Sequence, residues 1–132
     1  MGQPIEGRNR ELLEAKNFCH VGTIRADGTP HLTPVWVDVD GDLIVLNSAR
    51  GRAWPTNIER DPRVELNVMN LENPYEYVSI RGRAVEVTED GAGAHIDKLA
   101  LKYLGQDTYP YHQPGDVRVI IRIEADRIHH NG

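Results

Sequence analysis

The sequence is organised around the stretch Asn47-Ser48-Ala49-Arg50-Gly51-Arg52-Ala53-Trp54-Pro55-Thr56-Asn57-Ile58-Glu59-Arg60. An apolar strand is predicted to run into it at residues 43–46. A short helix is predicted to leave it at Pro55, because proline is tolerated in the first turn of a helix. Free N–H groups at a helix start attract anions, and Arg50 and Arg52 can add charge-assisted hydrogen bonds. The stretch therefore fits a phosphate site, and it also fits a solvated polar turn that caps a helix.

Length and composition indicate one soluble globular domain that spans residues 1–132. Apolar residues make up 39% and charged residues 27%, and a chain of this length buries roughly two thirds of its unfolded surface. The net charge of −5 argues against a nucleic-acid partner, which needs a basic surface. The sequence shows no membrane span and no signal peptide. The one cysteine, Cys19, is expected to be a buried, structural thiol in a cytoplasmic protein.

The first half of the sequence is predicted to be a helix followed by three strands. The helix is expected at residues 7–16, where Leu12, Leu13 and Lys16 share one face. Strands are expected at residues 18–25, 31–39 and 43–48. The turn-forming pairs Asp27-Gly28 and Asp40-Gly41 separate them, so the three strands are expected to form a meander.

The second half adds three more strands and a longer helix. Asp61-Pro62 ends the short helix, and strands are predicted at residues 63–69, 75–87 and 117–124. Val64, Leu66 and Val68 alternate with polar residues in the first of these strands, and Arg118 and Arg122 form the polar side of the last. Apolar positions change phase near Gly82, which predicts a bulge or sharp bend there. A helix is predicted from Glu89 to Gly105, followed by a loop at residues 106–116. The apolar face of that helix is expected to comprise Ile96, Leu99, Ala100 and Tyr103.

Six strands, mostly joined by short turns, and three small helices predict a mainly β fold with an antiparallel barrel. No metal site is predicted, because the six histidines are scattered and the adjacent His129 and His130 are interpreted as a solvated tail. His20 and His31 could approach one another across the first hairpin, but a structural role is favoured. No dinucleotide fingerprint, P-loop or nucleophile elbow is present. Catalytic residues stay unidentified, so any chemistry is expected to come from a bound organic cofactor.

Several segments together resemble the flavin/deazaflavin oxidoreductase split-barrel family, which is related to pyridoxamine 5′-phosphate oxidase. The resemblance rests on the order and spacing of motifs along nearly the whole chain, and it is strongest to the type-B branch of probable F420-dependent enzymes. The motifs are Phe18-Cys19-His20-Val21-Gly22-Thr23-Ile24, Asp27-Gly28-Thr29-Pro30-His31, Thr33-Pro34-Val35-Trp36-Val37, Asn47-Ser48-Ala49-Arg50-Gly51-Arg52 with Asn57-Ile58, Asp61-Pro62-Arg63-Val64, residues 77–86 around Arg81-Gly82-Arg83, Lys102-Tyr103-Leu104-Gly105 and residues 123–128.

This resemblance implies a six-stranded split β-barrel, the FMN-binding split-barrel fold, and a homodimer with two cofactor sites at the subunit interface. The cofactor ring would lie against residues 33–36, and its phosphate-bearing arm would run to Ser48, Arg50 and Arg52. Segments of the second subunit, at residues 75–77 and 109–112, would close the pocket. The candidate cofactor-binding residues are Thr33, Pro34, Val35, Trp36, Asn47, Ser48, Arg50, Arg52, Trp54, Asn57 and Tyr77.

One position departs from the pattern of the family. Many relatives carry a lysine two residues after the position of Arg52, where this chain has Trp54. The loss of that cation weakens the prediction of a phosphate site. The tryptophan could stack on a ligand, or pack at the dimer interface.

Three functions remain open at this stage. The resemblance favours a reductase that uses reduced coenzyme F420, a deazaflavin, to deliver a hydride to an electron-poor double bond of a small molecule. An FMN-binding oxidoreductase of the pyridoxamine-phosphate-oxidase-like class is the alternative, because the same turn suits its terminal phosphate. The third is a non-catalytic dimer that carries a cofactor or an apolar ligand. No side chain is identified as a proton donor, and the substrate is not named.

Overall fold

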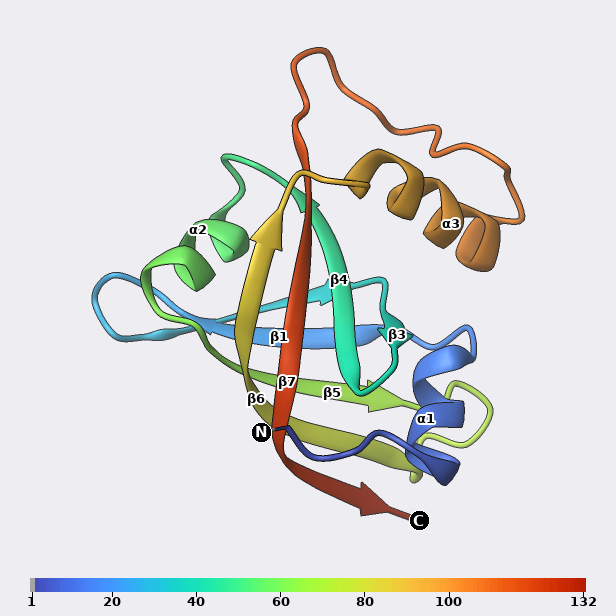
Figure 1. The fold of residues 1–132 in the computed structure, drawn as a ribbon. Coiled ribbons are helices and arrows are strands. Elements are labelled where there is room, and N and C mark those ends of the chain that lie inside the picture. Colours follow the sequence, from blue (N-terminus) through green and yellow to red (C-terminus); the bar gives the residue numbers. More distant parts are fainter. Residues whose placement is uncertain (1) are drawn as a thin grey trace.

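Seven strands and three helices make up residues 2–132, which the computed structural model describes (Figure 1). In chain order they are α1 (Gly7–Glu14), β1 (Cys19–Ile24), β2 (Pro30–Val35), β3 (Asp38–Asp40), β4 (Leu43–Ala49), α2 (Ala53–Arg60), β5 (Arg63–Met69), β6 (Tyr77–Thr88), α3 (Ala92–Leu104) and β7 (Arg118–Asn131). None of the helices in these residues is both long and apolar enough to cross a membrane.

All seven strands belong to one antiparallel sheet in the order β2-β1-β5-β6-β7-β4-β3. In Figure 1, β1, β2 and β5 run across the molecule, whereas β4 and β7 run down it, so the sheet curls strongly. Its two edge strands, β2 and β3, are consecutive in the sequence but are not hydrogen-bonded to each other. The sheet is therefore open along this line, and it has seven strands where a six-stranded split barrel was predicted.

The single strand predicted at residues 31–39 is wrong, because the chain changes partner in the middle of it. β2 pairs with β1, whereas β3 pairs with β4. Between them, the Val37 amide donates to the hydroxyl of Tyr103 at 3.1 Å, and the ammonium of Lys102 donates to the Val37 carbonyl at 2.7 Å. Side chains of α3 thus replace the ladder hydrogen bonds at the split, and six predicted strands become seven.

The bend predicted near Gly82 is confirmed by two register shifts between β6 and β7. One falls between Arg81 and Gly82 and the other between Ala84 and Glu86. A Cβ on Gly82 would lie 2.1 Å from the carbonyl oxygen of Glu124, so only glycine allows the two strands to approach this closely. The second shift leaves Val85 on the surface, 45% exposed, whereas Val87 packs against the core.

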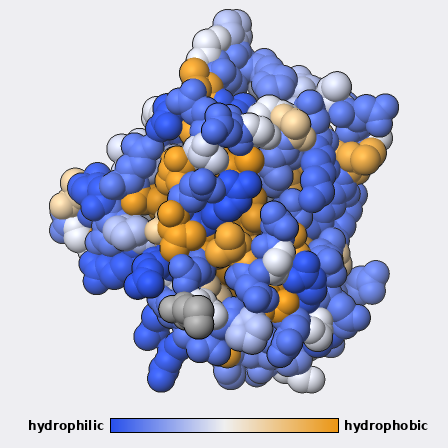
Figure 2. Space-filling view, viewed as in Figure 1, coloured by the Kyte–Doolittle hydropathy of each residue, from blue (hydrophilic) through white to orange (hydrophobic). Residues whose placement is uncertain are grey.

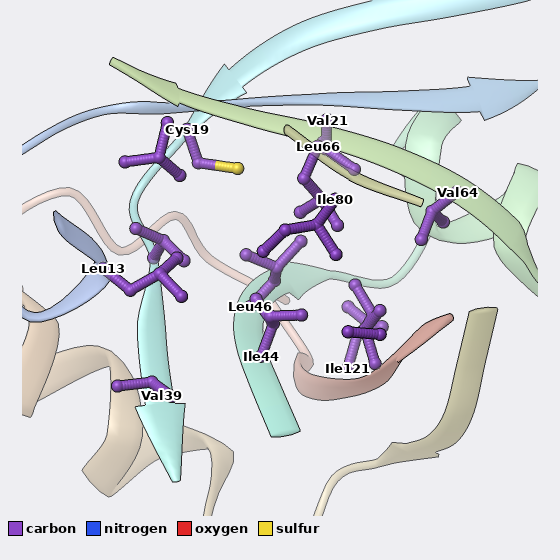
Figure 3. Packing of buried hydrophobic residues seen from close by; sticks show 14 of the residues in the cluster. Leu13, Cys19, Val21, Val39, Ile44, Leu46, Val64, Leu66, Ile80 and Ile121 are labelled. Carbon is purple, nitrogen blue, oxygen red and sulfur yellow. The ribbon is translucent and has the colours of Figure 1, made fainter. Parts of the chain in front are cut away.

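The core lies inside the curled sheet. Side chains from β1, β4, β5, β6 and β7 converge there, as Figure 3 shows for Val21, Leu46, Leu66, Ile80 and Ile121. Cys19 is part of this cluster and fully buried, as predicted. Burial raises the pKa of its thiol to about 12, which keeps the sulfur protonated and unreactive.

The predicted helices are observed with shifted ends. α1 ends at Glu14, and α2 begins at Ala53, two residues before the predicted Pro55. α3 buries all four residues of its predicted apolar face and ends where Gly105 adopts a left-handed conformation with φ of 70°. α3 packs over β4 and β7, so these two strands are covered on both faces.

The last strand is longer than predicted. β7 continues to Asn131 and pairs with β6 over almost its whole length. His129 and His130 therefore lie in a strand rather than in a solvated tail, and the His130 imidazole lies 2.9 Å from a carboxylate oxygen of Glu76. The first half of β7 is buried on both faces, which places Arg118 in the interior instead of in solvent.

Candidate functional site

A groove of about 300 Å³ opens between the split edge of the sheet and α3. We call it the α3 groove, and it contains eight of the eleven predicted cofactor-binding residues. It is lined by Thr33, Pro34, Val35, Trp36, Asn47, Ser48, Arg52, Trp54, Ile96, Leu99, Tyr109, Tyr111 and Arg118. This lining contains two arginines and no acidic residue, although the whole chain carries a net charge of −5.

Ser48 and Arg52 mark one end of the α3 groove, at the end of β4 and the start of α2. Ser48 is 1% exposed, and its hydroxyl oxygen has no hydrogen-bond partner among residues 2–132. The guanidinium of Arg52 likewise forms no hydrogen bond or ion pair within that range. A buried hydroxyl without a partner costs roughly 1–3 kcal/mol, so these two side chains suit an anion that enters the groove.

Arg118 lies on the wall of the α3 groove, and a hydrogen bond to Asn47 holds its guanidinium in place. Its Nε donates to the side-chain oxygen of Asn47 at 3.0 Å, while its Nη1 has no partner in the described chain. Burial lowers the pKa of Arg118, and the nearby positive charge of Arg52 lowers it further. Two guanidinium groups therefore face the same hollow without a carboxylate bound to either.

Asn47 connects Arg118 to α3 and β3. Its amide nitrogen donates to the carbonyl of Ala92 and lies 3.0 Å from Nδ1 of His95. The other ring nitrogen of His95 lies 3.1 Å from a carboxylate oxygen of Asp38, which also accepts from Lys98 at 3.0 Å. Burial alone would raise the pKa of Asp38, but the hydrogen bonds from His95 and Lys98 outweigh it and hold that pKa well below its ordinary value.

Aromatic rings form the apolar side of the α3 groove. Trp36 stacks on Tyr103 with centroids 5.2 Å apart and meets the edge of Tyr109 at 5.9 Å. Tyr109 in turn contacts Tyr111 at 5.6 Å and lies over the guanidinium of Arg118 at 5.1 Å. Tyr109 and Tyr111 therefore line the groove of their own chain, whereas the sequence interpretation placed residues 109–112 of the second subunit at the pocket.

Three predicted site residues lie outside the α3 groove. Arg50 is turned away and forms ion pairs with Glu59 at 2.6 Å and Glu89 at 2.9 Å. Asn57 is buried and donates to the hydroxyl of Thr23 at 3.1 Å, which ties α2 to β1. Tyr77 begins β6, with its ring 6.3 Å from that of His129.

Two histidines considered together are not opposite one another. His20 faces Pro34 and His31 faces Thr23 across the first hairpin, so no catalytic pair forms there. Residues 2–132 contain no group of three or more histidine, cysteine, aspartate or glutamate side chains that could hold a metal ion.

The sequence interpretation missed Arg118, Ile96 and Leu99 as groove residues. Arg118 was taken as the polar side of an alternating strand, because a strand at a sheet surface normally alternates between core and solvent. The available signal was Ile120, which breaks the alternation and indicates that both faces of β7 are covered. α3 supplies that cover, and it brings Ile96 and Leu99 with it.

Comparisons with known proteins agree with this fold. The sequence model of the pyridoxamine 5′-phosphate oxidase family matches residues 5–132. Among solved structures, an F420 reductase is 30% identical, with 95% of this chain and 98% of that chain covered and a TM-score of 0.82. No curated protein sequence matches this chain.

Two further structures share the fold at lower identity. A conserved hypothetical protein from Mycobacterium tuberculosis is 23% identical, with a TM-score of 0.73 over 97% of this chain and 86% of that one. A putative pyridoxamine 5′-phosphate oxidase from Listeria innocua is 19% identical, with a TM-score of 0.68 over 91% of this chain and 92% of that one. The match over residues 5–132 shows that the chain belongs to the pyridoxamine 5′-phosphate oxidase family of flavin/deazaflavin split-barrel proteins.

Proposed function

We propose that this protein is an F420-dependent reductase of the cytoplasm that binds the charged arm of its cofactor in the α3 groove. The observation that carries the proposal is the buried, unpartnered hydroxyl of Ser48 beside two guanidinium groups in a hollow without acidic residues. An anionic cofactor matches such a site in charge and in hydrogen-bonding capacity. The similarity to an F420 reductase at 30% identity favours the deazaflavin among such cofactors.

The groove residues divide into two roles in this proposal. Ser48 and Arg52 hold the phosphate-bearing arm, and residues 33–36 with Tyr109 form the wall for the flat ring. When bound, the reduced deazaflavin supplies a hydride to an electron-poor double bond of a small molecule. The protein positions the two reactants and excludes water, and such positioning can remove several kcal/mol from a barrier.

A homodimer is part of the proposal, because the α3 groove is small. Its volume of about 300 Å³ lies at the lower end of the range for small-molecule sites, so a second protomer would complete it. A second hollow of about 780 Å³, with Ile24, Leu32 and Val64 in its lining, lies on the outer face of β1, β5 and β6. Apolar residues also interrupt the charged surface in the middle of the face drawn in Figure 2, in the region of β6 and β7.

The outer-face hollow gives a test of the dimer. Leu32 lines it and is 70% exposed, so Leu32→Asp is expected to convert a dimer into a monomer in sedimentation equilibrium. Leu71→Asp is the matched control, since Leu71 is 49% exposed but lines a different hollow beside α1. A monomeric wild type, or equal effects of both variants, would remove the dimer from the proposal.

The cofactor itself is tested by titration. Fluorescence quenching of F420 and of FMN by the purified protein is expected to show tight binding of F420. Arg52→Ala is expected to weaken that binding by about 1–3 kcal/mol, or roughly 5- to 150-fold. Arg50→Ala is the matched control, because Arg50 is held by Glu59 and Glu89 outside the groove, and a change below about twofold is expected.

Two results would replace the leading function by its alternatives. Tight FMN binding without a response to F420 would establish the FMN-dependent oxidoreductase. Binding of F420 without oxidation of its reduced form, across a panel of quinones and enones, would favour the carrier. Equal losses in Arg50→Ala and Arg52→Ala would show that the turn does not bind the cofactor through Arg52.

A further inference from the structure

Arg118 is buried in a way that protein interiors rarely retain. It is 9% exposed, no carboxylate forms an ion pair with it, and its Nη1 is left without a partner in residues 2–132. Desolvating a guanidinium is costly unless an anion compensates for it. The aromatic face of Tyr109 at 5.1 Å and the negative charge of Asp116 give only part of that compensation. The positive charge that stays uncompensated faces the α3 groove, which Arg118 lines.

Arg118, Asn47, His95 and Asp38 form a series of hydrogen bonds. The two end groups, Arg118 and Asp38, fix which atoms donate and which accept along it. Arg118 can only donate, so it requires the oxygen of Asn47 at 3.0 Å. The amide nitrogen of Asn47 must then donate, both to the Ala92 carbonyl and to Nδ1 of His95. The remaining ring nitrogen, Nε2, must carry the proton of His95 and donate to Asp38, which only accepts when ionised.

We propose that Arg118 is an anion-binding residue of the α3 groove and that Asn47 and His95 are positioning residues that orient it through this chain. The group recognised is a phosphate or carboxylate. The inference deepens the proposed function, since the cofactor arm is the natural source of such a group. It applies equally to any anionic ligand that enters the groove.

Protonation of His95 is incompatible with this arrangement. A doubly protonated ring cannot accept from Asn47, so the amide would have to turn over and present its NH₂ group to Arg118, donor against donor. The orientation of Arg118 therefore depends on the neutral ring of His95, protonated at Nε2.

The closing experiment measures binding of two probes, F420 and inorganic pyrophosphate, by calorimetry at about pH 8. Arg118→Gln is expected to weaken both by at least about tenfold, as removal of a charge-assisted hydrogen bond predicts. Arg122→Gln is the matched control on the same strand, because Arg122 pairs with Glu86 outside the groove. Asn47→Asp should weaken binding as much as Arg118→Gln, since the new carboxylate neutralises the guanidinium.

His95→Gln separates positioning from a merely structural role. Glutamine can accept from Asn47 through its oxygen and donate to Asp38 through its nitrogen. The variant is expected to keep most of the affinity, whereas His95→Leu, which offers no acceptor to Asn47, is expected to lose it. Nitrogen NMR of the wild-type ring should show the neutral form protonated at Nε2.

Each outcome decides the inference. Full affinity in Arg118→Gln, an Nδ1-protonated ring, or equal affinities of His95→Gln and His95→Leu would overturn it, even if F420 binds and turns over. Pyrophosphate binding that depends on Arg118, without binding of F420, would support the inference while the proposed function fails. Binding of neither probe by the wild type would overturn both.

Discussion

The two faces of β4 are both buried, but they bury opposite chemistry. On the inner face, Ile44 and Leu46 pack among the aliphatic side chains of the curled sheet (Figure 3). On the outer face, Val45 lies against Ala92 of α3, and Asn47 enters the hydrogen-bonded chain from Arg118 to His95. The inner face is aliphatic as far as Leu46, whereas the outer face combines an apolar contact with a chain of polar side chains, and a helix covers both.

This difference shows where buried polar atoms without hydrogen-bond partners lower the stability of the fold. Buried polar groups in native proteins are normally hydrogen-bonded, and the chain behind Arg118 follows that rule. Of the four buried side-chain atoms without a partner in residues 2–132, two are Ser48 Oγ and Arg118 Nη1, which line the α3 groove. The unpaired atoms at this end of β4 and β7 mark the place where a ligand, rather than the protein, completes the contacts.

Leu46→Ala tests the inner face and should have the largest effect. Leu46 is fully buried, so the substitution leaves a cavity and is expected to lower the free energy of unfolding by about 2–5 kcal/mol. Urea unfolding measures it. Cofactor affinity at temperatures where the variant stays folded should change little, and a large loss of affinity would contradict the separation of the two faces.

Asp38→Asn tests the polar layer through its dependence on pH. The pKa of Asp38 is lowered in the folded state, so its contribution to stability is present above the unfolded value of about 4 and is lost as the pH falls below it. The variant should be less stable than the wild type at pH 7 by about 1.5–3 kcal/mol. The difference in the free energy of unfolding between the two proteins should disappear toward pH 2. A gap that does not vary with pH would show that the carboxylate charge is not what matters.

Ionisation of the buried Cys19 thiol tests the inner face at alkaline pH. Its folded pKa of about 12 exceeds the unfolded value near 9, so its contribution is complete below pH 9 and is lost as the pH rises toward 12. Between pH 9 and 11 the wild type should lose about 2 kcal/mol more than Cys19→Ala. Parallel alkaline profiles for the two proteins would rule out thiol ionisation as the cause.

Ser48→Ala should have the smallest effect on stability, and it separates loss of cofactor affinity from loss of stability most directly. The hydroxyl has no partner to lose, so the free energy of unfolding should stay within about 0.5 kcal/mol of the wild type. Affinity for the cofactor should fall by about 1 kcal/mol, the net value of one hydrogen bond. A clear loss of stability without loss of affinity would assign Ser48 a structural role.

Local sequence signals determined most of the elements of this protein. Turn pairs such as Asp27-Gly28 and the alternation of Val64, Leu66 and Val68 predicted strands and hairpins, because these patterns depend only on neighbours in the chain. The motif order pointed to the family, which the match over residues 5–132 confirms. Local signals also predicted the bend at Gly82, since a strand that changes phase must contain an irregularity.

The tertiary structure decided which side chains of those elements meet. Two arginines separated by one residue look equivalent in sequence, yet Arg50 pairs with Glu59 and Glu89 while Arg52 lines the groove. Apart from Ile120, strand β7 alternates like a surface strand, and the packing of α3 over it buries Arg118 beside Asn47. Periodicity records how a chain alternates, but burial of its second face depends on a helix distant in sequence, and one apolar residue at an outward position is all the local pattern that this packing leaves.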